Sequence, residues 1–149
     1  IEIPLTAYIP KDYITRDDSK LEFYRSIADI KSNKDLERIQ KTWLDRYGPV
    51  PEEATNLLKI AHLKLTARSL GIEKIIAKKI PGFGRAEWNI HLRPLALRPS
   101  QRVRTLRLYE GSLYKEEKQE LIIKISEIRE ASQEITDYLK SLEAVSNQG

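Results

Sequence analysis

Apolar and polar side chains alternate at the start of the chain. Over residues 1–9 the apolar positions recur at every second residue, which is the period of a β-strand. They are Ile1, Ile3, Leu5, Ala7 and Ile9. Pro4 lies within this run and has no N–H to donate to a neighbouring strand, so the pattern predicts an edge strand.

The apolar spacing then changes to that of three successive helices, at residues 19–31, 33–47 and 51–70. Ser19 and Glu22 stand at the spacing of a capping box at the start of the first helix. A glycine follows the second helix and another follows the third, as is common at helix C-termini. In the second helix the apolar positions that follow helical spacing are Leu36, Ile39, Trp43, Leu44 and Tyr47. The short connections predict a layer of tightly folded helices.

The second half of the chain changes to strand-like patterns. β-Branched residues at 72–80, a turn at 81–84 and an alternating run at 86–92 predict a β-hairpin. Residues 93–105 contain two prolines and leave a short helix open as one interpretation.

Residues 106–109 and 121–125 are predicted as further strands, and residues 126–145 as a closing helix. The apolar face of that helix consists of Ile128, Ala131, Ile135, Leu139 and Leu142. Helices first, strands later and a last helix predict an α+β fold rather than an alternating α/β fold. Its expected parts are an N-terminal edge strand, three consecutive helices, a small, mostly antiparallel sheet and a C-terminal helix.

Composition places the chain among ordinary globular proteins. At 149 residues, with 40% hydrophobic and 32% charged residues, it suits a single domain with one core. No apolar run is long enough to cross a bilayer, and the amino terminus lacks the pattern of a secretory signal. The sequence has no cysteine, which fits a reducing compartment, so we expect a cytoplasmic location. It also has no methionine and begins within a predicted strand, which indicates a fragment of a longer protein.

Charge is distributed unevenly along the chain. Residues 64–107 carry 11 basic and 2 acidic groups, whereas the flanking segments are net acidic. Such a segment could contact phosphate or an acidic protein surface. Lysine and arginine on a sheet edge also keep other strands away, and this interpretation stays open. If the segment binds nucleic acid, the expected contacts are Lys78, Lys79 and Arg85.

The sequence offers no recognisable constellation for catalysis or metal binding. His62 and His91 are the only histidines, and neither has the spacing of a catalytic or ligating group. The glycine pair at 82 and 84 lacks the Gly-Lys-Ser/Thr ending of a phosphate-binding loop and leads into a strand. Paired acids at 17–18 and 52–53 are explained by favourable charge at helix starts. We therefore expect no enzyme activity, cofactor or metal in this chain.

A series of short motifs in the first half stands in the order found in one bacterial protein family. The motifs are Ala7-Tyr8-Ile9-Pro10 with Asp12-Tyr13-Ile14, Phe23-Tyr24-Arg25 with Ile27-Ala28, Asp35-Leu36, Leu44-Asp45-Arg46-Tyr47-Gly48 with Pro51, Leu57-Leu58 with Ile60-Ala61, and Leu70-Gly71-Ile72. Together they resemble the C-terminal domain of the bacterial transcription-repair coupling factors. The resemblance covers about the first half and becomes thin beyond Ile80.

The resemblance implies a regulatory role within a larger protein. In the family, an ATP-dependent DNA translocase and a polymerase-binding module lie upstream, and they supply the contacts with DNA and RNA polymerase. The C-terminal domain acts as a clamp on an amino-terminal module that resembles the repair protein UvrB, and it hides the surface that recruits UvrA. We therefore expect residues 1–149 to be a single regulatory domain from the C-terminal end of a multidomain translocase.

The polar side of the predicted second helix is the expected docking surface. It presents Arg38, Lys41, Thr42, Asp45 and Arg46. Asp45 could pair with arginines on the partner, although Asp45 and Arg46 could instead hold the turn at the following glycine. Relatives often carry an acid where this chain has Thr42. A nucleic-acid-binding accessory domain is the alternative function, and a small independent enzyme ranks behind it.

Overall fold

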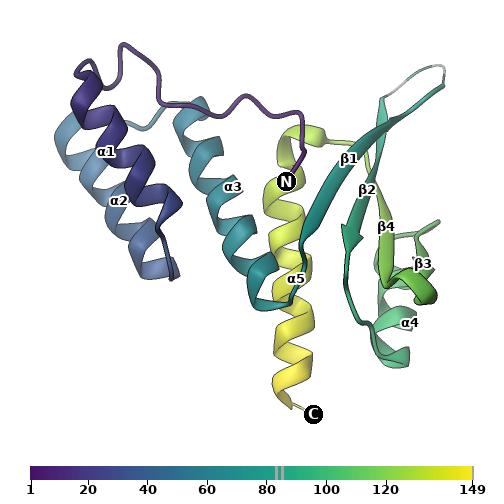
Figure 1. The fold of residues 1–149 in the computed structure, drawn as a ribbon. Helices are drawn as coiled ribbons and strands as arrows, with labels where there is room; N and C mark the ends of the chain where they lie inside the picture. Colours follow the sequence, from purple (N-terminus) through teal and green to yellow (C-terminus); the bar gives the residue numbers. More distant parts are fainter. Residues whose placement is uncertain (83, 85, 149) are drawn as a thin grey trace. The chain divides into compact units, whose positions relative to one another are not determined.

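The computed structural model describes residues 1–82, 84 and 86–148, with side chains described through residue 143 (Figure 1). The chain divides into two compact units, Leu5–Leu65 and Ile1–Pro4 together with Thr66–Gly149. The described residues combine helices with a four-stranded antiparallel sheet, so the predicted α+β class is confirmed. The expectation of a single regulatory domain stays a prediction.

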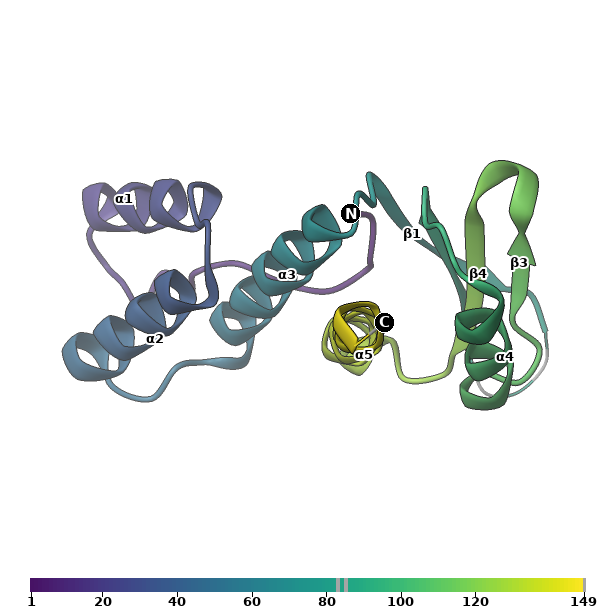
Figure 2. The ribbon, with the colours of Figure 1, turned by 90° about the horizontal axis from the view of Figure 1, so that it is seen from below.

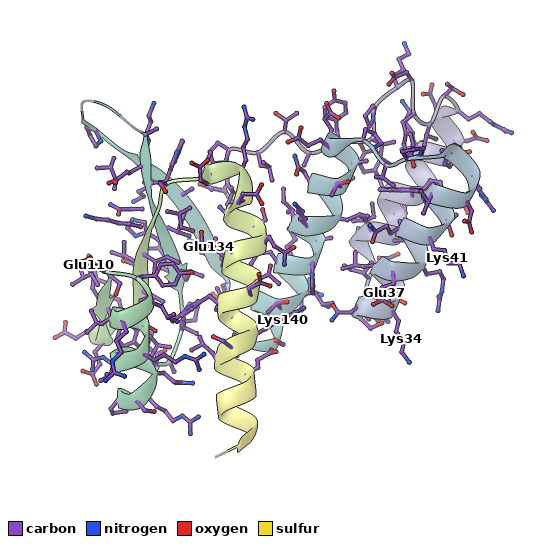
Figure 3. The ribbon with its side chains drawn as sticks, turned by 180° about the vertical axis from the view of Figure 1, so that it is seen from behind. Lys34, Glu37, Lys41, Glu110, Glu134 and Lys140 are labelled. Carbon is purple, nitrogen blue, oxygen red and sulfur yellow. The ribbon has the colours of Figure 1, made fainter. Side chains whose placement is uncertain are left out.

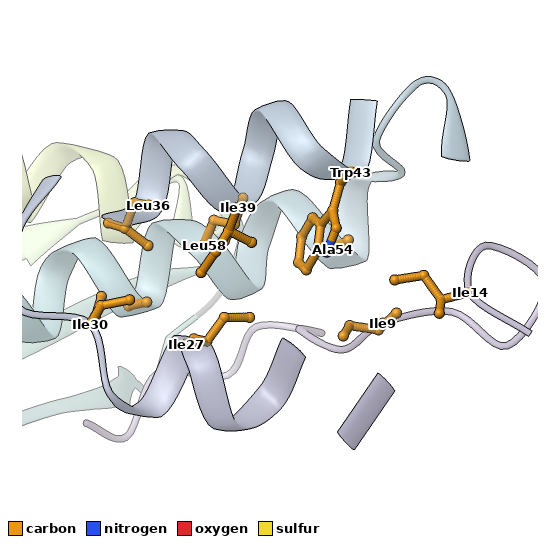
Figure 4. Packing of buried hydrophobic residues seen from close by; sticks show 10 residues of the cluster. Ile9, Ile14, Ile27, Ile30, Leu36, Ile39, Trp43, Ala54 and Leu58 are labelled. Atoms are coloured by element: carbon orange, nitrogen blue, oxygen red, sulfur yellow. The ribbon is translucent and has the colours of Figure 1, made fainter. Parts of the chain in front are cut away.

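Three helices build the unit Leu5–Leu65: α1 (Asp17–Ala28), α2 (Asn33–Tyr47) and most of α3 (Glu52–Ser69). Figure 4 shows the core that they enclose. It consists of Ile9, Ile14, Ile27, Ile30, Leu36, Ile39, Trp43, Ala54, Leu58 and Ala61. Trp43 is fully buried and meets the rings of Tyr13 and Phe23 edge to face.

The predicted edge strand at residues 1–9 is wrong. Only Glu2 pairs with the sheet, through a single parallel bridge to Ile76. Ile9 and Ile14 are instead buried in the core of the helical unit. Ile9, the last apolar position of the predicted strand, therefore packs among helices, and Pro4 has no N–H to donate toward the sheet.

The boundaries of α2 and α3 follow the predictions to within one residue, whereas α1 begins before the predicted start and ends at Ala28, three residues before the predicted end. That helix begins at Asp17 with Arg16 as its N-cap residue, so the capping box predicted at Ser19 does not form. The Asp18 carboxylate instead accepts a hydrogen bond from the Ser19 N–H and pairs with Arg16 at 2.8 Å. Two acids in the first turn make the earlier start favourable. Helix α2 ends as predicted at Gly48, which has a φ of +86°.

A sheet in the order β1-β2-β4-β3 forms the other unit, with every pairing antiparallel. Its strands are β1 (Lys74–Ile80), β2 (Glu87–Arg93), β3 (Leu113–Lys115) and β4 (Glu120–Ile125), so the predicted hairpin and the strand at 121–125 are confirmed. The cross-strand partners Ile75 and Leu92, and Ile90 and Ile123, are all buried on one face. Strand β3 was not predicted.

Helices α4 (Pro99–Leu108) and α5 (Ala131–Gln148) lie beside the sheet (Figure 2). The predicted strand at 106–109 is wrong, because the chain there completes α4. Pro99 suits the first turn of a helix, and the Arg98 N–H donates to the Gln101 side chain at 2.8 Å. Short 3₁₀ turns, η1 (Glu116–Lys118) and η2 (Ile128–Glu130), connect the remaining elements. The closing helix is confirmed, with Ile135 and Leu139 fully buried.

Candidate protein-docking surface on helix α2

Helix α2 divides into a buried side and an exposed side. Leu36, Ile39 and Trp43 are buried on one side. Lys34, Glu37 and Lys41 follow one another along the exposed side (Figure 3). The exposed side is therefore free to meet a partner along the length of the helix.

The structure brings three of the five predicted docking residues together. Arg38, Lys41 and Asp45 are exposed and lie three, four and seven positions apart, which places them on one face of a helix. Thr42 is half-buried, and Thr42 and Arg46 lie four positions apart on the neighbouring strip. The predicted set is thus a central row of three charged groups with two residues along its border.

Leu44 is one of the apolar positions of the predicted helix, but it does not share the burial of Leu36, Ile39 and Trp43. Its side chain is 55% exposed. Successive helical residues are turned by about 100°, so Leu44 cannot follow the fully buried Trp43 into the same narrow core. Leu44 instead lies three residues after Lys41, beside the charged row. This turn of 100° was the signal that could have identified it as an apolar member of the surface.

Asp45 lies in an unfavourable position for helix stability. It stands in the last turn of α2, where the helix dipole favours cations. Within the described part of the chain it forms no ion pair. The turn at Gly48 is held by other groups, namely the Leu44 carbonyl, which accepts from the Gly48 N–H at 3.1 Å, and the Tyr13 hydroxyl. The local structure therefore gives Asp45 no stabilising task.

The end of α2 is fixed by the opening segment of the same unit. The Tyr13 hydroxyl lies 3.1 Å from the Trp43 carbonyl oxygen and 2.9 Å from that of Gly48. Burial, and secondarily the neighbouring Tyr47, raise the pKa of Tyr13, so the hydroxyl stays a donor at neutral pH. These contacts hold the last turn of α2 in one conformation and so preorganise the groups displayed on it.

The start of α2 has its own anchor. The Asp35 carboxylate accepts a hydrogen bond from the Lys31 N–H at 2.9 Å, and this bond lowers the pKa of Asp35. Arg38 lies 4.0 Å from the same carboxylate and is largely exposed. A contact this long at the surface stabilises the fold little, so the Arg38 guanidinium remains available to a partner.

The two predicted nucleic-acid contacts within the described residues lie on different faces of the sheet. Lys78 and Lys79 are both exposed on β1, but neighbouring residues of a strand point to opposite faces. Lys78 pairs with Asn89, which pairs in turn with Lys124. Arg85 lies outside the described residues. One face of the sheet thus carries a row with a lysine at each end.

We also searched the described residues for a metal site, for buried ionisable clusters and for a membrane-spanning helix. They contain no group of three or more histidine, aspartate or glutamate side chains that could hold a metal ion. His91 lies beside the buried Glu120, with 3.6 Å between Nδ1 and Oε1, in a cluster completed by Arg93. None of the described helices has the length and apolar character needed to cross a membrane.

Comparison with known proteins gives a consistent result. The model of the TRCF domain family matches residues 3–90. The transcription-repair-coupling factor of Mycobacterium tuberculosis is 35% identical over 115 residues, which cover 77% of this chain and 9% of that protein. The Escherichia coli factor is 37% identical over 75 residues, covering 50% of this chain and 6% of that protein.

A solved structure extends the similarity to nearly the whole chain. The crystal structure of the C-terminal domain of a transcription-repair coupling factor matches with a TM-score of 0.74 over 97% of this chain and 92% of that one. At 18% identity this match establishes a shared fold. The family model covers more than half of the chain, and we conclude that the chain belongs to the TRCF domain family.

Proposed function

We propose that this domain is an autoinhibitory protein-interaction module in transcription-coupled DNA repair. It docks through the exposed side of α2 on the UvrB-like module of its parent protein and hides the surface that recruits UvrA. ATP-dependent translocation on DNA and the contact with RNA polymerase would belong to other parts of that parent. Membership of the TRCF domain family supports this role.

Asp45 is the observation that carries the proposed docking site. An exposed carboxylate in the last turn of a helix opposes the helix dipole, so it is there at some cost to stability. Pairing with an arginine of a partner would reverse that cost, because a charge-assisted hydrogen bond gains strength when it is removed from water. The exposed Leu44, one residue away, supplies apolar area beside the ionic contact.

A tethered domain needs little intrinsic affinity to stay docked. Linking two modules gives an effective concentration in the millimolar range for short flexible connections. A contact with a Kd of about 0.1 mM would then keep roughly nine molecules in ten closed at an effective concentration of ~1 mM. Engagement of polymerase or DNA elsewhere in the parent could open the clamp by making the free energy of docking only about 1–2 kcal/mol less favourable.

The proposal is tested by titrating the 149-residue chain against the isolated UvrB-like module, with UvrA as competitor. Asp45→Arg should weaken binding about tenfold or more, since it replaces an attraction by a repulsion. Glu22→Arg is the matched control, because Glu22 is an exposed acid on α1. Binding that survives Asp45→Arg, or that UvrA does not displace, would contradict the proposed site.

Nucleic-acid binding through the sheet is the second candidate. The row Lys78–Asn89–Lys124 supports it, because two lysines on one face can contact neighbouring phosphates. Exchange of both lysines for glutamine should then weaken binding to a duplex oligonucleotide and reduce the dependence of that binding on salt. An unchanged salt dependence would argue against this face.

A further inference from the structure

Helix α4 buries polar side chains and exposes apolar ones. Its inward side carries Gln101 and Thr105, which are only 6% and 2% exposed. Its outward side carries Val103 and Leu106, which are 51% and 57% exposed. A helix selected only for folding would show the opposite arrangement.

The inward polar side chains take part in hydrogen bonds of the fold. The Gln101 side chain accepts from the Arg98 N–H, and the Thr105 hydroxyl donates to the Gln101 carbonyl at 2.7 Å. The Thr105 hydroxyl also lies 2.6 Å from the hydroxyl of Tyr138 on α5. Of these contacts, the one between Thr105 and Tyr138 connects α4 to α5, on the side of the helix opposite Val103 and Leu106, which are more than half exposed.

Arginines surround the outward apolar residues. The segment from residue 98 to residue 109 contains four arginines and no lysine. The Arg102 guanidinium lies over the Tyr114 ring, 5.1 Å from its centroid, and 3.6 Å from Glu116, so it is held in position. Arg104 and Arg107 are exposed and form no ion pair within the described residues. The outward side thus combines apolar area with positive charge that the domain leaves unneutralised.

We infer that the outward side of α4, formed by Val103, Leu106 and Arg107 and bordered by Arg102 and Arg104, is a docking surface for a protein segment that presents acidic side chains around an apolar patch. The charges select an acidic partner. Exposed leucine and valine among arginines, with lysine absent, favour a protein over a nucleic acid, since arginine is enriched and lysine depleted at protein interfaces. Phosphate would be bound equally well without the apolar residues.

This inference goes beyond the proposed clamp. Helix α4 belongs to the unit that contains the sheet, whereas α2 belongs to Leu5–Leu65. Variants of α4 and of Asp45 therefore test separate surfaces, and either proposal can be refuted while the other stands. A single helix face offers a small contact area, so we expect a weak and reversible interaction.

The test uses a defined probe, a synthetic amphipathic peptide of leucine and glutamate, with a glutamine-for-glutamate version as its comparison. Titration into the ¹⁵N-labelled chain should shift amide signals between Pro99 and Leu108, and the glutamine peptide should bind at least fivefold more weakly. Leu106→Ser should weaken binding about tenfold, because it removes an exposed apolar anchor. The thermal midpoint of Leu106→Ser should lie close to that of the parent chain, since more than half of the Leu106 side chain is exposed in the folded protein.

Matched controls separate the surface from general effects. Leu21→Ser changes an equally exposed leucine, 58%, on α1 and should leave peptide binding unchanged. Equal binding of both peptides, or full binding by Leu106→Ser, would overturn the inference. Duplex oligonucleotide binding that Arg107→Gln weakens and Leu106→Ser does not would assign the arginines to phosphate instead. Self-association in sedimentation experiments that Leu106→Ser abolishes would assign the surface to a second copy of the chain.

Discussion

Removal of the Tyr13 hydroxyl should loosen the end of α2 without disturbing the core. In Tyr13→Phe the ring keeps its edge contact with Trp43, so packing is conserved. The carbonyl oxygens of Trp43 and Gly48 lose the hydroxyl donor that lies 3.1 and 2.9 Å away. The substitution therefore isolates the polar link between the opening segment and the last turn of α2.

The expected magnitude follows from the environment of the bond. A hydrogen bond of a half-buried neutral group contributes about 0.5–1.5 kcal/mol, since water partly replaces the lost donor. We expect Tyr13→Phe to lower the free energy of unfolding by about 1 kcal/mol. Tyr47→Phe is the control: it changes a ring of the same aromatic cluster whose hydroxyl makes no hydrogen bond within the described residues, and it should cost under about 0.5 kcal/mol.

The two tryptophans allow the unfolding of each unit to be followed. Trp43 lies in Leu5–Leu65 and Trp88 lies in β2 of the other unit. Urea unfolding of the Trp88→Phe background reports Trp43 fluorescence alone, and the Trp43→Phe background reports the sheet unit. In the former, Tyr13→Phe should shift the midpoint without changing the slope. Within one background, coincidence of the tryptophan fluorescence transition and the far-UV circular dichroism transition would support the predicted single domain.

Two outcomes would refute this reasoning. If Tyr13→Phe is as stable as the parent chain while Tyr47→Phe is not, the hydroxyl does not hold the end of α2. If Tyr13→Phe is destabilised but binds the UvrB-like module with unchanged affinity, the fixed end of α2 does not preorganise the groups around Asp45.

Two further substitutions test the sheet unit. Leu139→Ala removes a fully buried side chain of α5 and should lower the free energy of unfolding by about 2–5 kcal/mol, measured with the Trp88 reporter. Glu120→Gln concerns a buried carboxylate: burial raises its pKa, but the 2.9 Å hydrogen bond from Arg93 and the neighbouring His91 together outweigh burial and leave the pKa lowered. A lowered pKa in the folded state means that the carboxylate stabilises the fold above its unfolded pKa and that this contribution is lost as pH falls through the folded value. Glu120→Gln should therefore cost about 1–2 kcal/mol at pH 7 and progressively less as the pH falls through the lowered pKa of Glu120, and a cost that stays constant over that range would contradict the ionic contribution.

The sequence predicts the described fold well where one physical signal dominates. Gly48 and Pro51 mark the boundary between α2 and α3 because each has a backbone preference that the neighbouring helices cannot override. The hairpin of β1 and β2 follows from β-branched residues on both sides of a turn. Long elements with strong periodicity need little tertiary information, and these were predicted with nearly the right bounds.

Prediction fails where tertiary contacts choose between local alternatives. The alternation of Ile1 to Ile9 is typical of a strand, but Ile9 is buried among helices. A pattern of period two does not identify the surface against which its apolar side chains pack. The three residues of β3 form a strand because β4 lies beside them, since so short a segment carries no periodic signal of its own.

Leu44 and Leu106 show why candidate interaction surfaces are harder to predict than cores. Each leucine extends an apolar pattern, so reasoning from periodicity places it inside or assigns it to a strand, yet each is more than half exposed. In both places the neighbouring exposed groups are charged, Lys41 and Asp45 beside one and Arg107 beside the other. A binding surface must keep apolar area in water until its partner arrives, and that arrangement contradicts the rule from which the fold is predicted. Under the two docking proposals, function rather than folding explains the choice of Leu44 and Leu106.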